Sequence, residues 1–273
     1  MKRVVALFFS FLLLFSISWE YEKKKYDFEE LLLKVKENPN NPYFLGKLGD
    51  CYLEKGVYNK AEKLYKKCLS IEPEESRHYI RLAKLYDKID KPEEAKSIIT
   101  NASYYFDRNG EVFSTLGNIE YKLGNFSNAL IAYEKALLFS DKKNKHYIYF
   151  GLGKTCRELK DYEKAKTFFI KSLQLKPYCW TYYEFGKLFL ELNNYKQAIW
   201  ALVNAKAFSY FQENKMKKLI WERLASAYFK YAIKLKDENK KEEAKSFLSK
   251  ITNDRDLSQT DYCEKASFWL KRF

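Results

Sequence analysis

Cysteine and histidine are the side chains in this sequence that could serve as nucleophiles, general bases or soft metal ligands. The 273 residues contain five cysteines and two histidines, namely Cys51, Cys68, Cys156, Cys179, Cys263, His78 and His146. No two cysteines have the C-x-x-C spacing, and two histidines do not complete the ligand set of a zinc site. We therefore expect no metal and no cofactor.

Catalytic motifs are also missing from the sequence. It contains no glycine-rich phosphate loop, no H-E-x-x-H and no nucleophile elbow. His78 and His146 are predicted to be exposed residues near the starts of helices. Cys68 and Cys156 are predicted to be buried free thiols, because the repeat described below assigns them to its interior. The sequence thus predicts that the chain is not an enzyme.

The elements that carry these residues form an internal repeat. Alanine recurs at intervals of 34, 34, 36 and 33 residues, at Ala61, Ala95, Ala129, Ala165 and Ala198. The first unit contains Leu45, Leu48-Gly49, Tyr52, Ala61, Tyr65, Cys68 and Pro73. Large and small residues recur in this register four more times. Each set follows the i, i+3, i+4, i+7 spacing of one helix face, so each unit is predicted to be two packed helices.

This pattern resembles the tetratricopeptide repeat, a helix-turn-helix unit of about 34 residues. The resemblance extends from residue 42 to residue 212 and implies an all-α, right-handed α-solenoid of antiparallel helix pairs. The expected parts are an N-terminal capping half-repeat (20–41), repeats 1 to 5 (42–75, 76–109, 110–143, 146–178 and 179–212), a divergent sixth repeat with a lengthened first helix (218–257) and a C-terminal capping helix (258–273). Glu120 occupies an apolar position of repeat 3, where we expect a shifted rotamer or partial exposure.

The first 19 residues differ from the rest. Lys2 and Arg3 precede Val4 to Trp19, a stretch without charged residues. Sixteen uncharged residues fit a signal-peptide core better than a full bilayer crossing, which takes about 20 residues. Ser16 and Ser18 supply small residues for cleavage. Cleaved export and an uncleaved N-terminal anchor both remain open, and either one predicts a periplasmic or envelope location.

The net charge is +14, from 50 basic and 36 acidic residues. Such an excess favours acidic partners through long-range attraction. The basic residues are mostly lysine and are spread along the chain, which equally describes solvated helix faces. Nucleic acid is not an expected partner.

The family resemblance implies that a partner peptide or domain binds a concave groove lined by the first helix of each repeat. Repeat 2 would contribute a basic end and repeats 3 to 5 an aromatic middle, a combination suited to an extended peptide that has an acidic residue or a carboxylate. The aromatic rings could equally pack between repeats. The candidate groove residues are Arg77, Arg81, Lys84, Lys88, Asn118, Tyr121, Lys122, Tyr147, Phe150, Lys154, Arg157, Trp180, Tyr183 and Lys187.

Three classes of function are compatible with these observations. The leading prediction is a non-catalytic adaptor or scaffold that binds proteins on the non-cytoplasmic side of a membrane. The alternative is a binding module for anionic envelope polymer or lipid, which would lose affinity steeply with added salt. An enzyme is the weakest of the three, because no catalytic group pair is visible.

Overall fold

The computed structural model describes residues 27–209 and 212–272, so the predicted export segment lies outside the described residues. The described part contains helices and no β-strand, which confirms the predicted all-α class. The chain divides into two compact units between Asp107 and Arg108. The repeat pattern, which continues across this point, did not predict the division.

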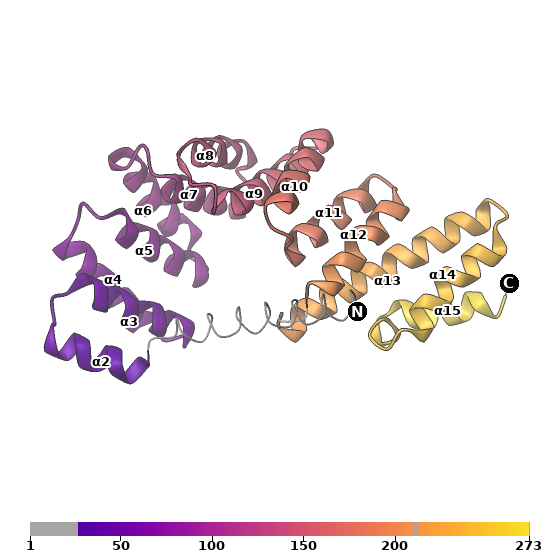
Figure 1. Ribbon diagram of the computed structural model, residues 1–273, viewed down its shortest axis with the longest axis horizontal. Helices are drawn as coiled ribbons and strands as arrows, with labels where there is room; N and C mark the ends of the chain where they lie inside the picture. The colour runs from indigo at the N-terminus through magenta and orange to yellow at the C-terminus, as the bar shows by residue number, and fades with distance from the viewer. Residues whose placement is uncertain (1–26, 210–211, 273) are drawn as a thin grey trace, which may run out of the picture. The chain divides into compact units, whose positions relative to one another are not determined.

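The first unit contains five helices, coloured indigo to purple in Figure 1. They are α2 (Phe28–Glu37), α3 (Pro42–Glu54), α4 (Tyr58–Ile71), α5 (Ser76–Lys88) and α6 (Pro92–Tyr105). Each helix packs against the next one along the chain. Asn41 caps α3 by accepting a hydrogen bond from the Tyr43 amide at 3.0 Å, and Pro42 occupies the first turn, where its missing N–H costs nothing.

The second unit continues the alternation of helices to the C-terminal end of the described chain (Figure 1). Its elements are α7 (Gly110–Lys122), α8 (Phe126–Phe139), α9 (Lys145–Glu158), α10 (Tyr162–Leu175), α11 (Cys179–Glu191), α12 (Tyr195–Ala207), α13 (Asn214–Asp237), α14 (Lys241–Asn253), the 3₁₀ turn η1 (Leu257–Gln259) and α15 (Tyr262–Leu270). Helix α13 has 24 residues, whereas α11 has 13. The extra length lets α13 pack against α12, α14 and α15.

The turn inside each helix pair has one residue in the left-handed region. Glycine fills this place at Gly56 and Gly124, with φ of 74° and 79°. The other pairs use non-glycine residues with φ between 54° and 64°, namely Asp90, Lys160, Asn193 and Asn239. A side chain here costs about 1–2 kcal/mol of backbone strain. The geometry of the turn is therefore conserved along the chain while its residue type is not.

Paired helices approach closely where the repeat places glycine. A Cβ on Gly49 would lie 2.5 Å from the Tyr65 ring, and a Cβ on Gly153 would lie 2.7 Å from the Phe169 ring. Tyr65 and Phe169 are fully buried. The absence of a side chain on one helix thus makes room for the large residue of its partner, as the periodicity predicts.

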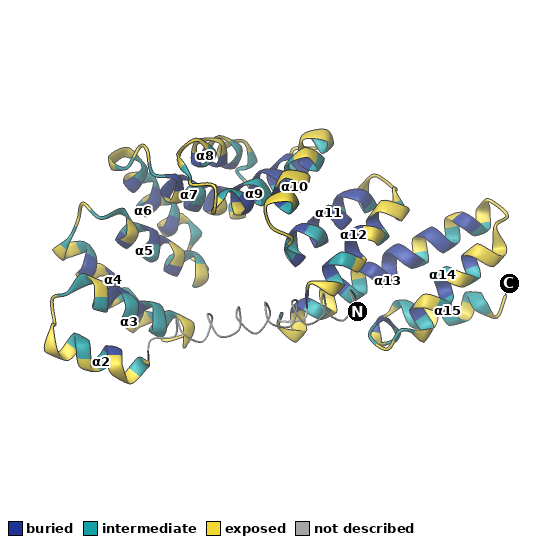
Figure 2. Ribbon diagram, in the orientation of Figure 1, coloured by how far each residue is buried: buried dark blue, intermediate teal, exposed yellow. Residues whose placement is uncertain are grey.

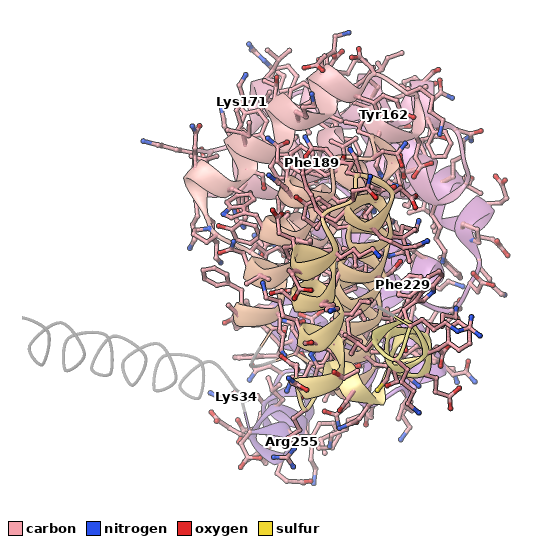
Figure 3. All side chains as sticks on the ribbon, turned by 90° about the vertical axis from the view of Figure 1, so that its right-hand side faces the viewer. Lys34, Tyr162, Lys171, Phe189, Phe229 and Arg255 are labelled. Carbon is pink, nitrogen blue, oxygen red and sulfur yellow. The ribbon has the colours of Figure 1, made fainter. Side chains whose placement is uncertain are left out.

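Burial follows the predicted helix faces. Buried residues form stripes along facing sides of the helices, and α13 is buried along most of its length (Figure 2). In Figure 3, Phe189 belongs to the interior, whereas Lys171 and Arg255 are exposed. Cys68 and Cys156 are buried as predicted, and burial raises the pKa of each thiol to about 11. Both thiols are therefore protonated and unreactive at neutral pH.

Three expectations about polar residues are wrong. Glu120 is only 5% exposed, and its carboxylate accepts a hydrogen bond from the side-chain amide of Asn125 at 2.7 Å. A local hydrogen-bond partner therefore replaces the expected exposure to solvent. His78 and His146 are buried rather than exposed. His78 lies 3.2 Å from a Glu72 carboxylate oxygen, and His146 lies 3.0 Å from the Lys143 carbonyl oxygen. In both cases the contact comes from a residue just before the helix that carries the ring.

Candidate partner-binding surface

The first helices of successive pairs form a continuous surface within each unit. In the first unit α3 contacts α5, and in the second unit α7 contacts α9, α9 contacts α11, and α11 contacts α13. In the described part of the chain, no second helix contacts the second helix of the next pair. The first helices therefore lie on the more closely spaced, concave side of each stack, where the candidate groove residues were predicted.

The basic end predicted in the first unit is partly occupied by an internal ion pair. Arg81 donates two hydrogen bonds to the Asp50 carboxylate, from Nε at 3.1 Å and from a terminal nitrogen at 3.0 Å. The Tyr65 hydroxyl donates to the same carboxylate at 2.8 Å. This bidentate geometry holds the guanidinium against α3. Arg81 thus links two repeats, and its guanidinium group is already occupied by the Asp50 carboxylate.

The other three basic residues of the first unit lie at the surface. Arg77, Lys84 and Lys88 are exposed on α5. The Lys88 ammonium group also donates to the Leu53 carbonyl oxygen at 3.5 Å. Arg77 and Lys84 therefore retain the exposure that a partner-binding role requires.

The basic residues of the second unit belong to a charge network centred on the buried Arg157 and Glu184. The Arg157 guanidinium lies 2.7 Å from a Glu158 oxygen, 2.7 Å from a Glu191 oxygen and 3.2 Å from a Glu184 oxygen. Lys187 lies 3.0 Å from Glu184. Glu184 and Glu191 belong to α11, whereas Arg157 and Glu158 belong to α9. The network therefore links two successive first helices.

Lys154 completes this network with an aromatic contact. Its ammonium group lies 4.0 Å from the centre of the Tyr121 ring and 5.5 Å from that of Phe150. The Tyr121 hydroxyl donates to Glu158 at 3.3 Å. Cation–π attraction at these distances helps to hold a partly desolvated ammonium group. Three basic and three acidic side chains thus balance one another on this face.

Burial and the neighbouring charges shift three pKa values here. Burial lowers the pKa of Lys154 despite the opposing charge of Glu184. Burial also opposes the charge on Arg157, but Glu184, Glu191 and Glu158 together raise the pKa of Arg157 above its usual value. Burial and the carboxylates of Glu158 and Glu184 raise the pKa of Tyr121 to about 12. Arg157 therefore stays protonated and charged at neutral pH, and the Tyr121 hydroxyl stays protonated.

The aromatic residues divide into exposed and packed groups. Tyr147 is 49% exposed, whereas Tyr183 is only 6% exposed and belongs to the C-terminal core. Trp180 and Phe150 are partly buried and pack against core clusters. The alternative that the rings pack between repeats therefore describes Tyr183, and Tyr147 is the aromatic residue most open to a partner.

The remaining candidates lie on α7. Asn118 and Lys122 are exposed, and the Asn118 side-chain oxygen accepts a hydrogen bond from the Tyr133 hydroxyl at 2.7 Å. Sequence reasoning placed all of these residues on one face but missed their internal partners. The acidic residues at lining positions of that face, which include Glu158, Glu184 and Glu191, were the available signal for these internal partners.

In the described residues, no group of three or more histidine, cysteine or carboxylate side chains is arranged to hold a metal ion. None of the helices in residues 27–209 and 212–272 has the length and apolarity needed to cross a bilayer. The features that stand out are stacked helix pairs and an ion-paired first-helix face. They define the class of helical-repeat proteins.

Comparison with known proteins identifies the kind of repeat in three segments of the chain. The tetratricopeptide-repeat family model matches residues 43–75, 110–142 and 146–179. These three segments are therefore tetratricopeptide repeats.

Two curated human relatives match part of the chain. Cilia- and flagella-associated protein 70 is 27% identical over 172 residues, which is 58% of this chain and 15% of that protein. Tetratricopeptide repeat protein 21B is 29% identical over 156 residues, which is 54% of this chain and 11% of that protein. The matched region thus spans a small fraction of either relative.

Two solved bacterial structures are similar over most of their length. PilF of Pseudomonas aeruginosa has a TM-score of 0.61 and 20% identity, covering 78% of this chain and 90% of PilF. The type IV pilus biogenesis factor PilW has a TM-score of 0.65 and 11% identity, covering 83% of this chain and 98% of PilW. At such low identity the similarity shows the fold alone.

Proposed function

We propose that this chain is a non-catalytic scaffold whose second unit binds a partner peptide or domain on its first-helix face. The observation that carries the proposal is the row of contacts from α7 through α9 and α11 to α13, which creates one continuous surface. Asn118, Lys122 and Tyr147 are exposed on this surface. Exposed tyrosine is a frequent energetic anchor of protein interfaces.

The charge balance of this face bears on the chemistry of the partner. Arg157 and Lys187 already contact carboxylates, so an acidic partner would have to displace Glu184 or Glu191 to reach them. Displacing the partner of a buried charge is costly. Aromatic contact and hydrogen bonding therefore provide the recognition in the second unit, while an acidic segment would be attracted by Arg77 and Lys84 in the first.

Site-specific photocrosslinking tests the proposed face. A photoreactive phenylalanine derivative at Tyr147 on α9 should crosslink the partner in cells, because this side chain is exposed on the first-helix face. The matched control places the same group at Trp200, which is 52% exposed on second helix α12. Equal crosslinking from both positions, or crosslinking from Trp200 alone, would refute the assignment of the binding face.

We also propose that the chain acts outside the cytoplasm, exported or anchored by its N-terminus. The support is the sequence of Lys2, Arg3 and the uncharged stretch from Val4 to Trp19. Cell fractionation should find the protein in the envelope. N-terminal sequencing of that material separates the two routes, because an intact Met1-Lys2 start excludes cleavage. Recovery of the whole protein in the cytoplasm would overturn the proposal.

A further inference from the structure

A basic cavity opens beside the N-terminal end of α9. Its volume is about 550 Å³, and it is lined by Lys142, Lys143, Asn144, His146, Tyr147, Leu175 and Lys176. The lining contains three lysines and no carboxylate, in contrast to the balanced charges around Arg157. The positive end of the α9 dipole lies in the same place. The electrostatics of this cavity therefore favour an anion.

His146 supplies an unsatisfied buried group in the wall of this cavity. The side chain is only 6% exposed, and its Nε2 atom has no hydrogen-bond partner. Nδ1 lies 3.0 Å from the Lys143 carbonyl oxygen, so Nδ1 is assigned as the donor and Nε2 carries the lone pair of the neutral ring. A buried polar atom without a partner is unfavourable, and a ligand that hydrogen-bonds to it recovers that free energy.

The surrounding contacts hold the ring in position. The Ser172 hydroxyl donates to the His146 carbonyl oxygen at 2.8 Å, and the Tyr147 ring centre lies 3.8 Å from the imidazole centre. Burial, together with the charge of Lys176, lowers the pKa of His146. The ring is therefore neutral at pH 7, and its Nε2 atom is available to accept a hydrogen bond.

We propose that this cavity binds a phosphate group, with Lys142, Lys143 and Lys176 attracting its anionic oxygens and His146 Nε2 accepting a hydrogen bond from its P–OH. A phosphate that keeps one proton offers both an anionic oxygen and a donor, which is what the lysines and the neutral imidazole require. Sulfate offers the charge but no donor at neutral pH. The cavity shares Tyr147 with the proposed partner-binding face, but phosphate binding by the lysines and His146 does not depend on the partner-binding role.

NMR titration of the full chain with inorganic phosphate tests the site, because the protein has only two histidines. At pH 6.5, we expect the His146 ring signals to shift saturably while those of His78 stay unchanged. His78 is the internal control because its Nε2 lies 3.2 Å from Glu72. Sulfate should bind more weakly than phosphate. Glycerol 3-phosphate that binds more tightly than inorganic phosphate would assign the site to a phosphomonoester, and equal binding would assign it to the free ion.

Charge-removing variants provide the matched comparison. Lys176→Gln should weaken phosphate binding about three- to fivefold, the effect of losing one solvent-screened charge contact. Lys196→Gln makes the same charge change at an exposed position on α12 and should leave binding unchanged. The proposal is wrong if His146 shows no saturable shift, if both histidines shift together, or if the two variants weaken binding equally.

Discussion

The same tyrosine hydrogen bond occurs in both units with different surroundings. In the first unit the Tyr65 hydroxyl donates to Asp50 at 2.8 Å, and in the second the Tyr133 hydroxyl donates to Asn118 at 2.7 Å. In each case the two residues are 15 positions apart and join the two helices of one repeat. Burial raises the pKa of both tyrosines. This bond is therefore a shared part of the repeat itself.

The link to the following repeat differs between the units. Asp50 also pairs with Arg81 from the next helix pair, but Gly151 occupies the corresponding place beside Asn118. A Cβ on Gly151 would lie 2.5 Å from the Tyr133 ring, so packing replaces the ion pair. The charged link of the second unit lies instead one repeat later, around Arg157. One scaffold thus joins its repeats by ion pairing or by close packing.

The largest loss of unfolding free energy should come from removing the buried guanidinium charge of Arg157. Arg157→Ala leaves Glu184 and Glu191 without their guanidinium, and breaking a buried pair costs about 3–5 kcal/mol. Arg81→Ala should cost less, because Asp50 is more exposed than Glu184 and water can solvate it. Urea unfolding with hydrogen exchange resolved by peptide would measure both. Exposed Arg223→Ala is the control, and equal losses for Arg157 and Arg81 would contradict the comparison.

The next largest difference in unfolding free energy should come from replacing Gly151 and Gly46 by alanine. Gly151→Ala forces a methyl group against the buried Tyr133 ring, and overpacking of this kind costs about 1–3 kcal/mol. Gly46→Ala meets only the guanidinium of Arg81, a flexible group that can move away. We therefore expect a smaller loss of unfolding free energy at Gly46. A larger loss at Gly46 than at Gly151 in thermal unfolding would show that the Arg81 position is the more rigid one.

Replacing the Asp50 carboxylate should separate the energetic contribution of the tyrosine hydrogen bond, which both units share, from that of the ion pair with Arg81. Asp50→Asn retains an acceptor for Tyr65 but loses the charge that holds Arg81, at a cost of about 1 kcal/mol after solvent screening. High salt should shrink this difference, because it screens the charge interaction in the wild type. Asn118→Ala, which removes a neutral acceptor, should show no such salt dependence in urea unfolding. A salt-independent Asp50→Asn effect would argue against the ionic link.

The smallest expected effect is a gain at a turn. Lys160 has φ of 64°, at the place where the preceding repeat has Gly124. Lys160→Gly removes backbone strain and should raise the unfolding free energy by about 0.5–1 kcal/mol, since glycine loses some of the gain through its greater unfolded-state entropy. Exposed Lys164→Gly, within α10, is the opposite control and should destabilise by about 1 kcal/mol. A loss at Lys160 would show that its side chain contributes more than the strain costs.

Much of the fold could be predicted because its signal is local. The recurring alanines and the glycine positions lie on single helix faces, and helix periodicity places them correctly without knowledge of the rest of the chain. The predicted interior positions of Cys68 and Cys156 were correct for this reason. The groove residues were predicted as a list of positions, and whether that surface binds a partner stays a prediction.

The candidate site was harder to predict because its contacts join distant residues. Arg157 reaches Glu191 across 34 residues, and no local pattern identifies which carboxylate it will choose. His146 was misplaced because a ring at a helix start is exposed or covered according to what the neighbouring loop places beside it. For Tyr183 the sequence left both arrangements open, and the contacts that bury it come from the C-terminal core.

By itself, the sequence determined the helix pairs, their turns and the residues that face the interior, because these follow from the repeat within each helix. Only the tertiary structure decided which charges are neutralised, which rings are covered and where an unsatisfied nitrogen lies beside three lysines. Those outcomes depend on side chains from different repeats meeting in space. Stacking sets these distances, and stacking is a property of the assembled chain.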